Sequence, residues 1–492
     1  MKLMKKIYIV FIILVSVSLA TSCKNAAVEI KDTIFKFGEN REKSPDAVNV
    51  TKQANGDELV SVHIANDEIK TFLLDAIDLE EIYDTEAAIN LKLDDKTSFD
   101  GISSDIAHYN DGDVELAAGG IYVLSGAING GCIKIIGDDR TLLVLNGLTI
   151  DNVDKDAIIS DGSVNIKLLE GSNNIINANS KKTELNAAGT AIAVKGNLSF
   201  SGKGNLHILG GFNEAIDCKK KLTFVSGNFD IDGSIDGIKS KKEIVIWDGI
   251  YTITTSDDAI KANDNEGSIF IKECKMNVVS GGKAIATDGS FIFAGGDLNL
   301  KSKSDCIEGK TCDLLGGSIV IDSEEDGINA SDKEQDKKAA QKGVYINITN
   351  GILKVDTKLD GLDSNGDLII EGGFIFISGP TTDTERIIDY NDEVICTGGA
   401  MMATGTYAKM QDLGENSSQN HIVIYYENEE IDGKLMLKDE NGDMLLAFDP
   451  AKPYKAAIIT SPNLIEGKTY IVEAGNRRDE VVITKGRTQV YS

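Results

Sequence analysis

The chain has 492 residues, 78 acidic against 50 basic side chains, and a formal net charge of −28. This length exceeds what one ordinary core requires, so we expect several structural units or one elongated array. A hydrophobic fraction of 41% excludes wholesale disorder. The acidity argues against nucleic acid as a partner, because a phosphate backbone requires a basic surface. Abundant glycine and an aromatic content of 6% indicate short turns and slim, repeated strands.

The N-terminus carries a targeting signal. Three lysines (Lys2, Lys5 and Lys6) precede an apolar run of 14 residues, Ile7–Ala20. This pattern is typical of a secretory signal peptide, and the run is too short to span a bilayer comfortably. Thr21-Ser22-Cys23 resembles a bacterial lipobox, in which the cysteine is lipidated. We therefore expect residues 1–23 to be a lipoprotein signal peptide and the protein to be extracytoplasmic, anchored in the cell membrane through Cys23. Ordinary cleavage near Ser22 is the alternative.

The residues that follow predict a tether. Lys24 to about Asn55 is polar and unpatterned, so we assign residues 24–75 to a tether and N-terminal extension. The remaining six cysteines are scattered and the four histidines are remote from one another, which leaves a zinc site unsupported. We expect Cys218, Cys274 and Cys306 to act as small buried hydrophobes, and one disulfide is left open.

A repeat of about 22 residues organises the middle of the chain. Its unit is an acidic residue, a small residue and then Ile or Leu, as in Asp236-Gly237-Ile238 and Asp258-Ala259-Ile260. The hydrophobic positions of the successive copies are Ile216, Ile238, Ile260, Ile285, Ile307, Ile328 and Leu362. Only the last interval is long, and it contains a charged insert, Asp332 to Lys342.

Between the copies lie alternating stretches broken by glycine, such as Lys242–Ile253 and Phe291–Leu300. Alternation with period two directs every second side chain to one face of a strand. Three short strands per repeat and no helical period fit one coil of a parallel β-helix, whereas a propeller blade needs about 40 residues. We therefore predict an all-β protein whose residues 76–410 form a right-handed parallel β-helix.

From Asn420 onward the pattern changes. Stretches such as His421–Tyr426 and Thr469–Val472 predict antiparallel strands without the repeat. The polar stretch Gln411–Gln419 is interpreted as a linker. We assign residues 411–492 to a small C-terminal β domain that caps the solenoid, and we expect a monomer.

Stacking of coils turns the repeat into columns of side chains. Equivalent residues of adjacent coils lie about 4.8 Å apart, so a bare acidic column is electrostatically costly. Lys239 and Lys261 accompany Asp236 and Asp258, and ordinary ion pairs suffice there. Further along the chain, the paired positions offer only oxygen ligands, which calcium prefers. The predicted calcium ligands are Asp305, Glu308, Asp326, Asn329, Asp360 and Asp363; a hydrated surface column of turn-forming residues is the alternative.

Several motifs resemble those of a bacterial carbohydrate-binding domain family. The most specific is the segment from Asp360 to Gly366, which reads DGLDSNG; the others are Gly372-Gly373, Ser378-Gly379-Pro380, Ile388-Asp389-Tyr390, Gly119–Gly126 and Leu142–Gly147. The resemblance covers roughly residues 90–485. It implies a pectate-lyase-like right-handed parallel β-helix that binds calcium and attaches to cellulose or acidic sugar polymers without cleaving them. This chain departs from the family pattern at Lys283 and in the charged insert, which bears on the number of calcium sites.

Three functions are compatible with these features. The first is a lipid-anchored, calcium-dependent polysaccharide binder, with Trp247, Tyr251 and Tyr390 as candidate carbohydrate-binding residues. The second is a calcium-dependent polysaccharide lyase, which requires a base near the metal. Lys239 or Lys261 would be candidates for that base, but their acidic neighbours favour the protonated form. The third is a structural adhesin or spacer. We predict no catalytic residues and favour the first function.

Overall fold

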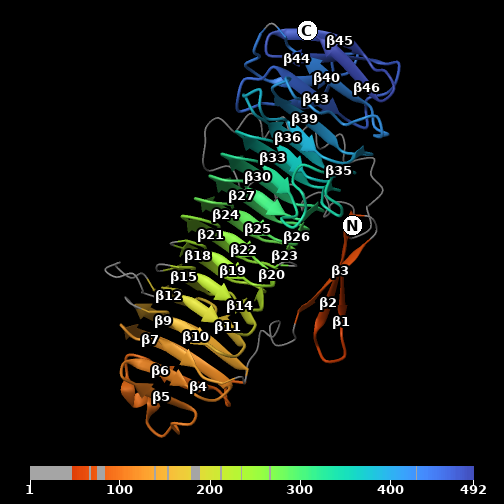
Figure 1. The fold of residues 1–492 in the computed structure, drawn as a ribbon. Helices are drawn as coiled ribbons and strands as arrows, with labels where there is room; N and C mark the ends of the chain where they lie inside the picture. The colour runs from red at the N-terminus through yellow and green to blue at the C-terminus, as the bar shows by residue number, and fades with distance from the viewer. Residues whose placement is uncertain are drawn as a thin grey trace.

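The structure is a computed structural model that describes residues 47–65, 68–74, 84–137, 140–151, 155–178, 189–210, 213–233, 235–264, 267–427 and 429–492. It is an elongated stack of β-coils with one end closed by the first strands of the stack and the other by the C-terminal strands (Figure 1). The predicted signal peptide, Cys23 and most of the predicted tether lie outside the described residues. The all-β parallel solenoid is confirmed, with about 11 turns.

Each coil contributes one strand to each of three parallel sheets. The first sheet consists of very short strands: β5 (Ala107–Asn110), β6 (Asp113–Leu116), β8 (Ile133–Ile135), β10 (Ile158–Ser160), β13 (Ile192–Val194), β16 (Ile216–Cys218), β19 (Ile238–Ser240), β22 (Ile260–Ala262), β25 (Ile285–Thr287), β28 (Ile307–Gly309), β31 (Ile328–Ala330), β34 (Leu362–Ser364) and β37 (Ile388–Tyr390). Only β5 pairs antiparallel, with β6.

The second and third sheets hold the longer strands. The second sheet contains β11 (Val164–Leu168), β14 (Leu198–Gly202), β17 (Lys221–Phe224), β20 (Glu243–Ile246), β23 (Ser268–Ile271), β26 (Ser290–Phe293), β29 (Thr311–Leu314), β32 (Tyr345–Ile348), β35 (Asp367–Ile370) and β38 (Val394–Cys396). The third contains β12 (Asn173–Asn177), β15 (Asn205–Leu209), β18 (Asn228–Gly233), β21 (Ile250–Thr255), β24 (Lys275–Ser280), β27 (Asp297–Ser302), β30 (Ser318–Ser323), β33 (Ile352–Thr357), β36 (Phe374–Ser378) and β39 (Ala400–Gly405).

The core is a set of apolar columns. Ile216, Ile238, Ile260 and Ile285 pair in register from coil to coil in the first sheet, and all four are fully buried. Each coil can bury this residue only by stacking on its neighbours, which makes the array one cooperative solenoid. The six described cysteines are buried free thiols, so the predicted hydrophobic role of Cys218, Cys274 and Cys306 is confirmed.

Glycines allow the tight turn between the second and third sheets. Gly317 has a φ of 70°, a left-handed conformation that side chains rarely adopt. A Cβ there would lie 2.6 Å from the Gly296 carbonyl oxygen of the preceding coil. The repeated glycine therefore permits coils to stack closely at this corner.

Both ends of the solenoid are covered. At the N-terminal end, β4 (Ile89–Lys92) pairs with β7 (Gly120–Asn129), which pairs with β9 (Thr141–Asp151); a 3₁₀ turn, η2 (Lys96–Phe99), lies between β4 and β5. At the C-terminal end, β43 (Ala456–Thr460) pairs antiparallel with β39 and with β40 (His421–Tyr425), which pairs with β46 (Arg487–Tyr491). The C-terminal region also has a separate four-stranded sheet, made of β41 (Leu435–Lys438), β42 (Met444–Phe448), β44 (Thr469–Ala474) and β45 (Arg477–Val482). These strands remove the open edges that favour aggregation.

The stretch Gln411–Gln419, interpreted from sequence as a linker, is packed against the last coils. Leu413 is fully buried, and the Gln419 amide donates to the Gly399 carbonyl at 2.9 Å and the Thr460 hydroxyl at 2.8 Å. The stretch therefore ties the C-terminal strands to the solenoid.

A three-stranded antiparallel sheet precedes the solenoid and covers its flank. Its strands are β1 (Val48–Lys52), β2 (Glu58–His63) and β3 (Ile69–Leu74), and they lie beside β20, β23 and β26 (Figure 1). Phe72 stacks on Phe270 with ring centroids 4.6 Å apart. Residues 48–52, which lie in the segment assigned to the tether and N-terminal extension, thus form a strand of a folded sheet whose other two strands supply the buried contacts.

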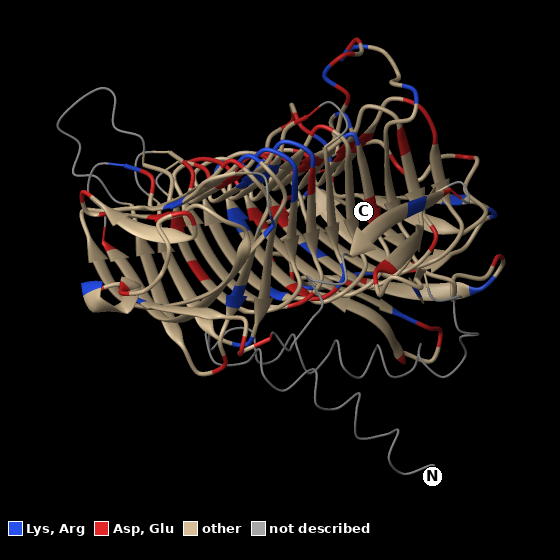
Figure 2. Ribbon diagram, turned by 90° about the horizontal axis from the view of Figure 1, so that it is seen from below, with Lys and Arg blue, Asp and Glu red and all other residues tan. Residues whose placement is uncertain are grey.

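Charged residues of both signs are interspersed along the turns and strands of the solenoid (Figure 2). No helix within the described residues has the length and apolar character needed to cross a membrane.

Phe72→Ala should release the N-terminal sheet from the flank. Truncating a buried Phe typically costs about 3–5 kcal/mol, and Phe72 belongs to the apolar cluster through which the sheet packs on the flank. We expect faster limited proteolysis between residues 47 and 74, with the solenoid core still protected. Leu73→Ala is the matched control, because Leu73 is 45% exposed on the opposite face of the same strand. Equal cleavage rates in both variants would contradict this packing role.

Candidate cation- and carbohydrate-binding site

The predicted columns exist. In the first sheet, Glu308 is in register with Asn329, Asn329 with Asp363, and Asp363 with Asp389. This paired column is called the strand column. The acidic residue two positions before each buried Ile or Leu forms a second line on the preceding turns, called the turn column; it includes Asp258, Asp305, Asp326 and Asp360.

The carboxylates of the turn column link successive coils through hydrogen bonds. The carboxylate of Asp305 accepts the backbone N–H of Asp326 at 3.3 Å, and Asp326 accepts that of Asp360 at 2.9 Å. Asp258 likewise accepts the N–H of Lys283 at 2.8 Å, and Asp360 accepts that of Arg386. Sequence reasoning missed this structural role, although the recurrence of an acid at one position of most coils was its signal.

In the central coils, lysines neutralise part of the charge. Lys239 Nζ lies 2.5 Å from Glu214 and 3.4 Å from Asp236, and Lys261 Nζ lies 2.6 Å from Asp258. Burial by itself would lower the pKa of both lysines, but these ion pairs outweigh it and raise the pKa of each. The ion pairs predicted for Asp236 and Asp258 are therefore present.

Glu308 does not fit its predicted role as a calcium ligand. Its carboxylate is 7% exposed and lies 2.9 Å from Lys283 Nζ and 3.2 Å from Lys333 Nζ. Although burial opposes it, these two ion pairs lower the pKa of Glu308. Sequence spacing concealed the pairs, because Lys283 comes from the preceding coil and Lys333 from the charged insert. Asp305 is also partly satisfied, since it accepts the Asn329 amide at 3.2 Å.

The remaining predicted ligands lie in an acidic cluster whose negative charge is offset by few basic side chains. Oxygen atoms of Asp360, Asp363 and Asp389 lie within 4.8 Å of one another. Burial and neighbouring carboxylates raise the pKa of Asp326 to about 8 and that of Asp363 to about 7. Burial also raises the pKa of Asp360 to about 7. Sequence reasoning missed Asp389 as a member, although it occupies the next position of the strand column.

Two features leave oxygen atoms of this cluster without a donor among the described residues. The Asn329 Oδ1 atom is buried without a hydrogen-bond partner. The carboxylate of Asp363, the residue in register with Asn329, makes no hydrogen bond or ion pair with other described residues. Arg386 is the nearby cation, and it pairs with Asp389. The donor set of carboxylate and amide oxygens is the one that calcium prefers.

A cleft of about 410 Å³ opens beside this cluster. It is lined by Lys283, Ser304, Asp305, Glu308, Glu325, Asn329, Ser331, Lys333, Lys337, Asp363 and Asn365. The charged insert supplies one wall, and two contacts of Asp332 hold it in place. Lys310 Nζ, from outside the insert, lies 2.9 Å from the Asp332 carboxylate, and within the insert the Gln341 side chain accepts the Asp332 N–H at 2.7 Å. The cleft therefore combines exposed lysines with oxygen ligands.

The predicted aromatic residues do not gather into a sugar-binding platform. Tyr251 is fully buried and stacks on Phe229 with centroids 5.1 Å apart, so its prediction as a carbohydrate-binding residue is wrong. Exposed and buried residues alternate along β21, and Tyr251 occupies a buried position. Trp247 is half-buried beside the N-terminal sheet, with Lys272 Nζ 3.8 Å from its ring centroid.

Tyr390 is half-buried, and its hydroxyl donates to the Asp412 carbonyl at 3.1 Å. It packs against the solenoid core, and the stretch that begins at Gln411 lies over it. Its role in carbohydrate binding stays a prediction.

A family model described as "Carbohydrate-binding domain-containing protein" matches residues 110–311 and 286–419. The chain belongs to this carbohydrate-binding domain family. The matched residues include both columns and the cleft. One solved structure, titled as the polysaccharide lyase-like protein from C. thermocellum in a gadolinium derivative, is similar at 21% identity with a TM-score of 0.39; the match covers 50% of this chain and 94% of that one. No curated protein gives a significant match.

The raised carboxyl pKa values in this carbohydrate-binding domain predict a pH-dependent stability. A carboxyl group with a folded pKa near 7–8 binds more protons in the folded than in the unfolded chain between about pH 4 and pH 8. In chelator, the melting temperature should therefore fall as pH rises through this range. Asp326→Asn removes the charge but retains an acceptor for the Asp360 N–H, so it should flatten the dependence by several degrees. Glu371→Gln, at an exposed position, should leave it unchanged; equal slopes in the two variants would refute the burial cost assigned to Asp326.

Proposed function

We propose that this carbohydrate-binding domain attaches to acidic, pectin-like polysaccharide without cleaving it, through calcium at the acidic cluster and the adjoining cleft. The observation that carries the proposal is the shared cleft wall, where Asp363 and Asn329 lie together with Lys333 and Lys337. Such a site offers a cation and ammonium groups to the carboxylates of a uronate chain.

Calcium would be held by Asp326, Asn329, Asp360 and Asp363, and Asp389 lies beside them in its ion pair with Arg386. Glu308 and Asp305 are left out of this ligand set, because lysines and the Asn329 amide already engage them. The bound ion offsets the repulsion within the cluster and supplies positive charge toward the cleft. A chain with a net charge of −28 needs such a bridge to meet an acidic glycan.

The lyase alternative is less well supported by the lysines near the cleft. Lys283 and Lys333 are paired with Glu308. Burial by itself would lower the pKa of the two lysines, but their acidic partners outweigh it and raise the pKa of each. Protonated lysines bind a uronate carboxylate but do not abstract a proton. Unsaturated product from polygalacturonate, detected by its ultraviolet absorbance with calcium present, would favour the lyase function instead.

Lys337→Gln should weaken binding to polygalacturonate by several-fold, because it removes an ammonium group from the cleft. Lys338→Gln is the matched control: Lys338 is the next residue, is exposed and does not line the cleft. Isothermal titration calorimetry in calcium, repeated in chelator, measures the affinities. Equal affinities for the two variants, or no binding by the unmodified protein, would refute the glycan proposal and favour a structural spacer.

We also propose that lipid on Cys23 anchors the protein at the membrane surface. The supporting feature is the basic, apolar and small-residue sequence before Cys23. Cys23→Ser should abolish incorporation of radiolabelled palmitate and shift the protein from the membrane to the soluble fraction. Unchanged membrane fractionation of the variant would overturn the anchor.

A further inference from the structure

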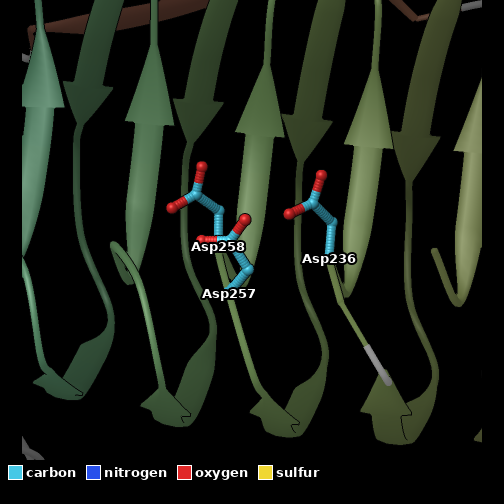
Figure 3. A group of neighbouring side chains, drawn as sticks. All are labelled: Asp236, Asp257 and Asp258. Carbon is cyan, nitrogen blue, oxygen red and sulfur yellow. The ribbon is translucent and has the colours of Figure 1, made fainter. Parts of the chain in front are cut away.

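A second acidic cluster lies in the central coils, away from the cleft. Asp257 and Asp258 occupy the turn between β21 and β22, and Asp236 occupies the equivalent turn of the preceding coil (Figure 3). Oxygen atoms from the three carboxylates all lie within 4.8 Å of one another. Two ligands on opposite sides of a calcium ion, each at about 2.4 Å, are separated by the same distance.

The cluster contains a buried oxygen with no partner. Asp236 is 4% exposed, and its Oδ1 atom is buried and accepts no hydrogen bond. Its other oxygen lies 3.4 Å from Lys239 Nζ, which is held more closely by Glu214 at 2.5 Å. A buried acceptor without a donor is costly, so this oxygen is available for a cation.

Local charges leave an excess of acid. Lys239 and Lys261 are the cations that pair with the cluster, and Lys239 is shared with Glu214. Four carboxylates thus meet two ammonium groups. Asp258 is fixed in place, because one oxygen binds Lys261 Nζ at 2.6 Å and the other accepts the Lys283 N–H at 2.8 Å. A divalent cation would cancel the remaining formal charge.

Gly282 lets the next coil approach the carboxylates closely. A Cβ at this position would lie 2.4 Å from Asp257 Oδ1 and 2.7 Å from Asp258 Oδ1. Asp257 is exposed, so a hydrated ion can reach the cluster from solvent and retain water ligands on that side. Access from solvent and an unused oxygen therefore coincide at one place.

We propose that Asp236, Asp257 and Asp258 form a second divalent-cation site, suited to calcium, that joins two adjacent coils of the solenoid. The site is separate from the acidic cluster beside the cleft. It holds the coils together and does not require a glycan.

Calcium titration by calorimetry of the full-length chain, first stripped with chelator, tests the site. Asp257→Asn should bind one calcium ion fewer than the unmodified protein and lose part of the calcium-induced rise in melting temperature. Asp297→Asn removes the same charge from an exposed position at the opposite end of a third-sheet strand, and it should bind as the unmodified protein does. An unchanged stoichiometry in Asp257→Asn would overturn the proposal.

Two further variants separate the possible failures. Gly282→Ala keeps all three carboxylates, but its Cβ would lie 2.4 Å from Asp257 Oδ1 and displace that carboxylate, so it should also lose one ion. Asp363→Asn should lose calcium at the cleft while retaining the ion at Asp257. If Asp363→Asn binds calcium normally and Asp257→Asn does not, the cleft assignment fails and the second site stands. Equal melting temperatures of the variants and the unmodified protein in chelator exclude misfolding as the cause, and the absence of any calcium binding would refute both sites.

Discussion

The regular stacking of short parallel strands is the constraint on which the rest of this molecule depends. It places each residue of a coil beside its equivalent in the next, as Ile238 and Ile260 show in the core. The same register that buries apolar columns also forces acidic residues into columns. Apolar stacking stabilises the array, whereas acidic stacking costs free energy unless each carboxylate finds a donor or a cation.

The chain meets this cost in different ways along its length. The turn-column carboxylates accept backbone N–H groups from the next coil, which gives an acid at this position a structural function that needs no metal. In the central coils, lysines add ion pairs. Toward the C-terminal coils, lysines are replaced by Asn329, Asp363 and Asp389, and the pKa values of the carboxyls rise. The location of uncompensated acid, rather than the presence of acid, distinguishes a candidate cation site from a structural column.

The sequence was sufficient for the fold and the columns, because both follow directly from a 22-residue period and strand alternation. It was insufficient wherever the outcome depended on contacts between distant segments. The pairing of Lys333 with Glu308 required the folded insert, and the burial of Tyr251 involves packing against Phe224 and Phe229 of the preceding coil. Asp257 was missed because it lies one position outside the repeated motif and becomes a neighbour of Asp236 only when coils stack. The packing of the N-terminal sheet against the solenoid likewise could not be predicted from a local sequence pattern.

The account rests on a cation at the acidic end of the strand column. The most direct measurement is anomalous diffraction from crystals grown with calcium and then exchanged into a lanthanide. We expect a strong anomalous peak in contact with Asp360 and Asp363, with Asn329 Oδ1 directed toward it. The account would be contradicted if the cluster showed no anomalous peak and Arg386 or a lysine of the insert contacted these carboxylates instead.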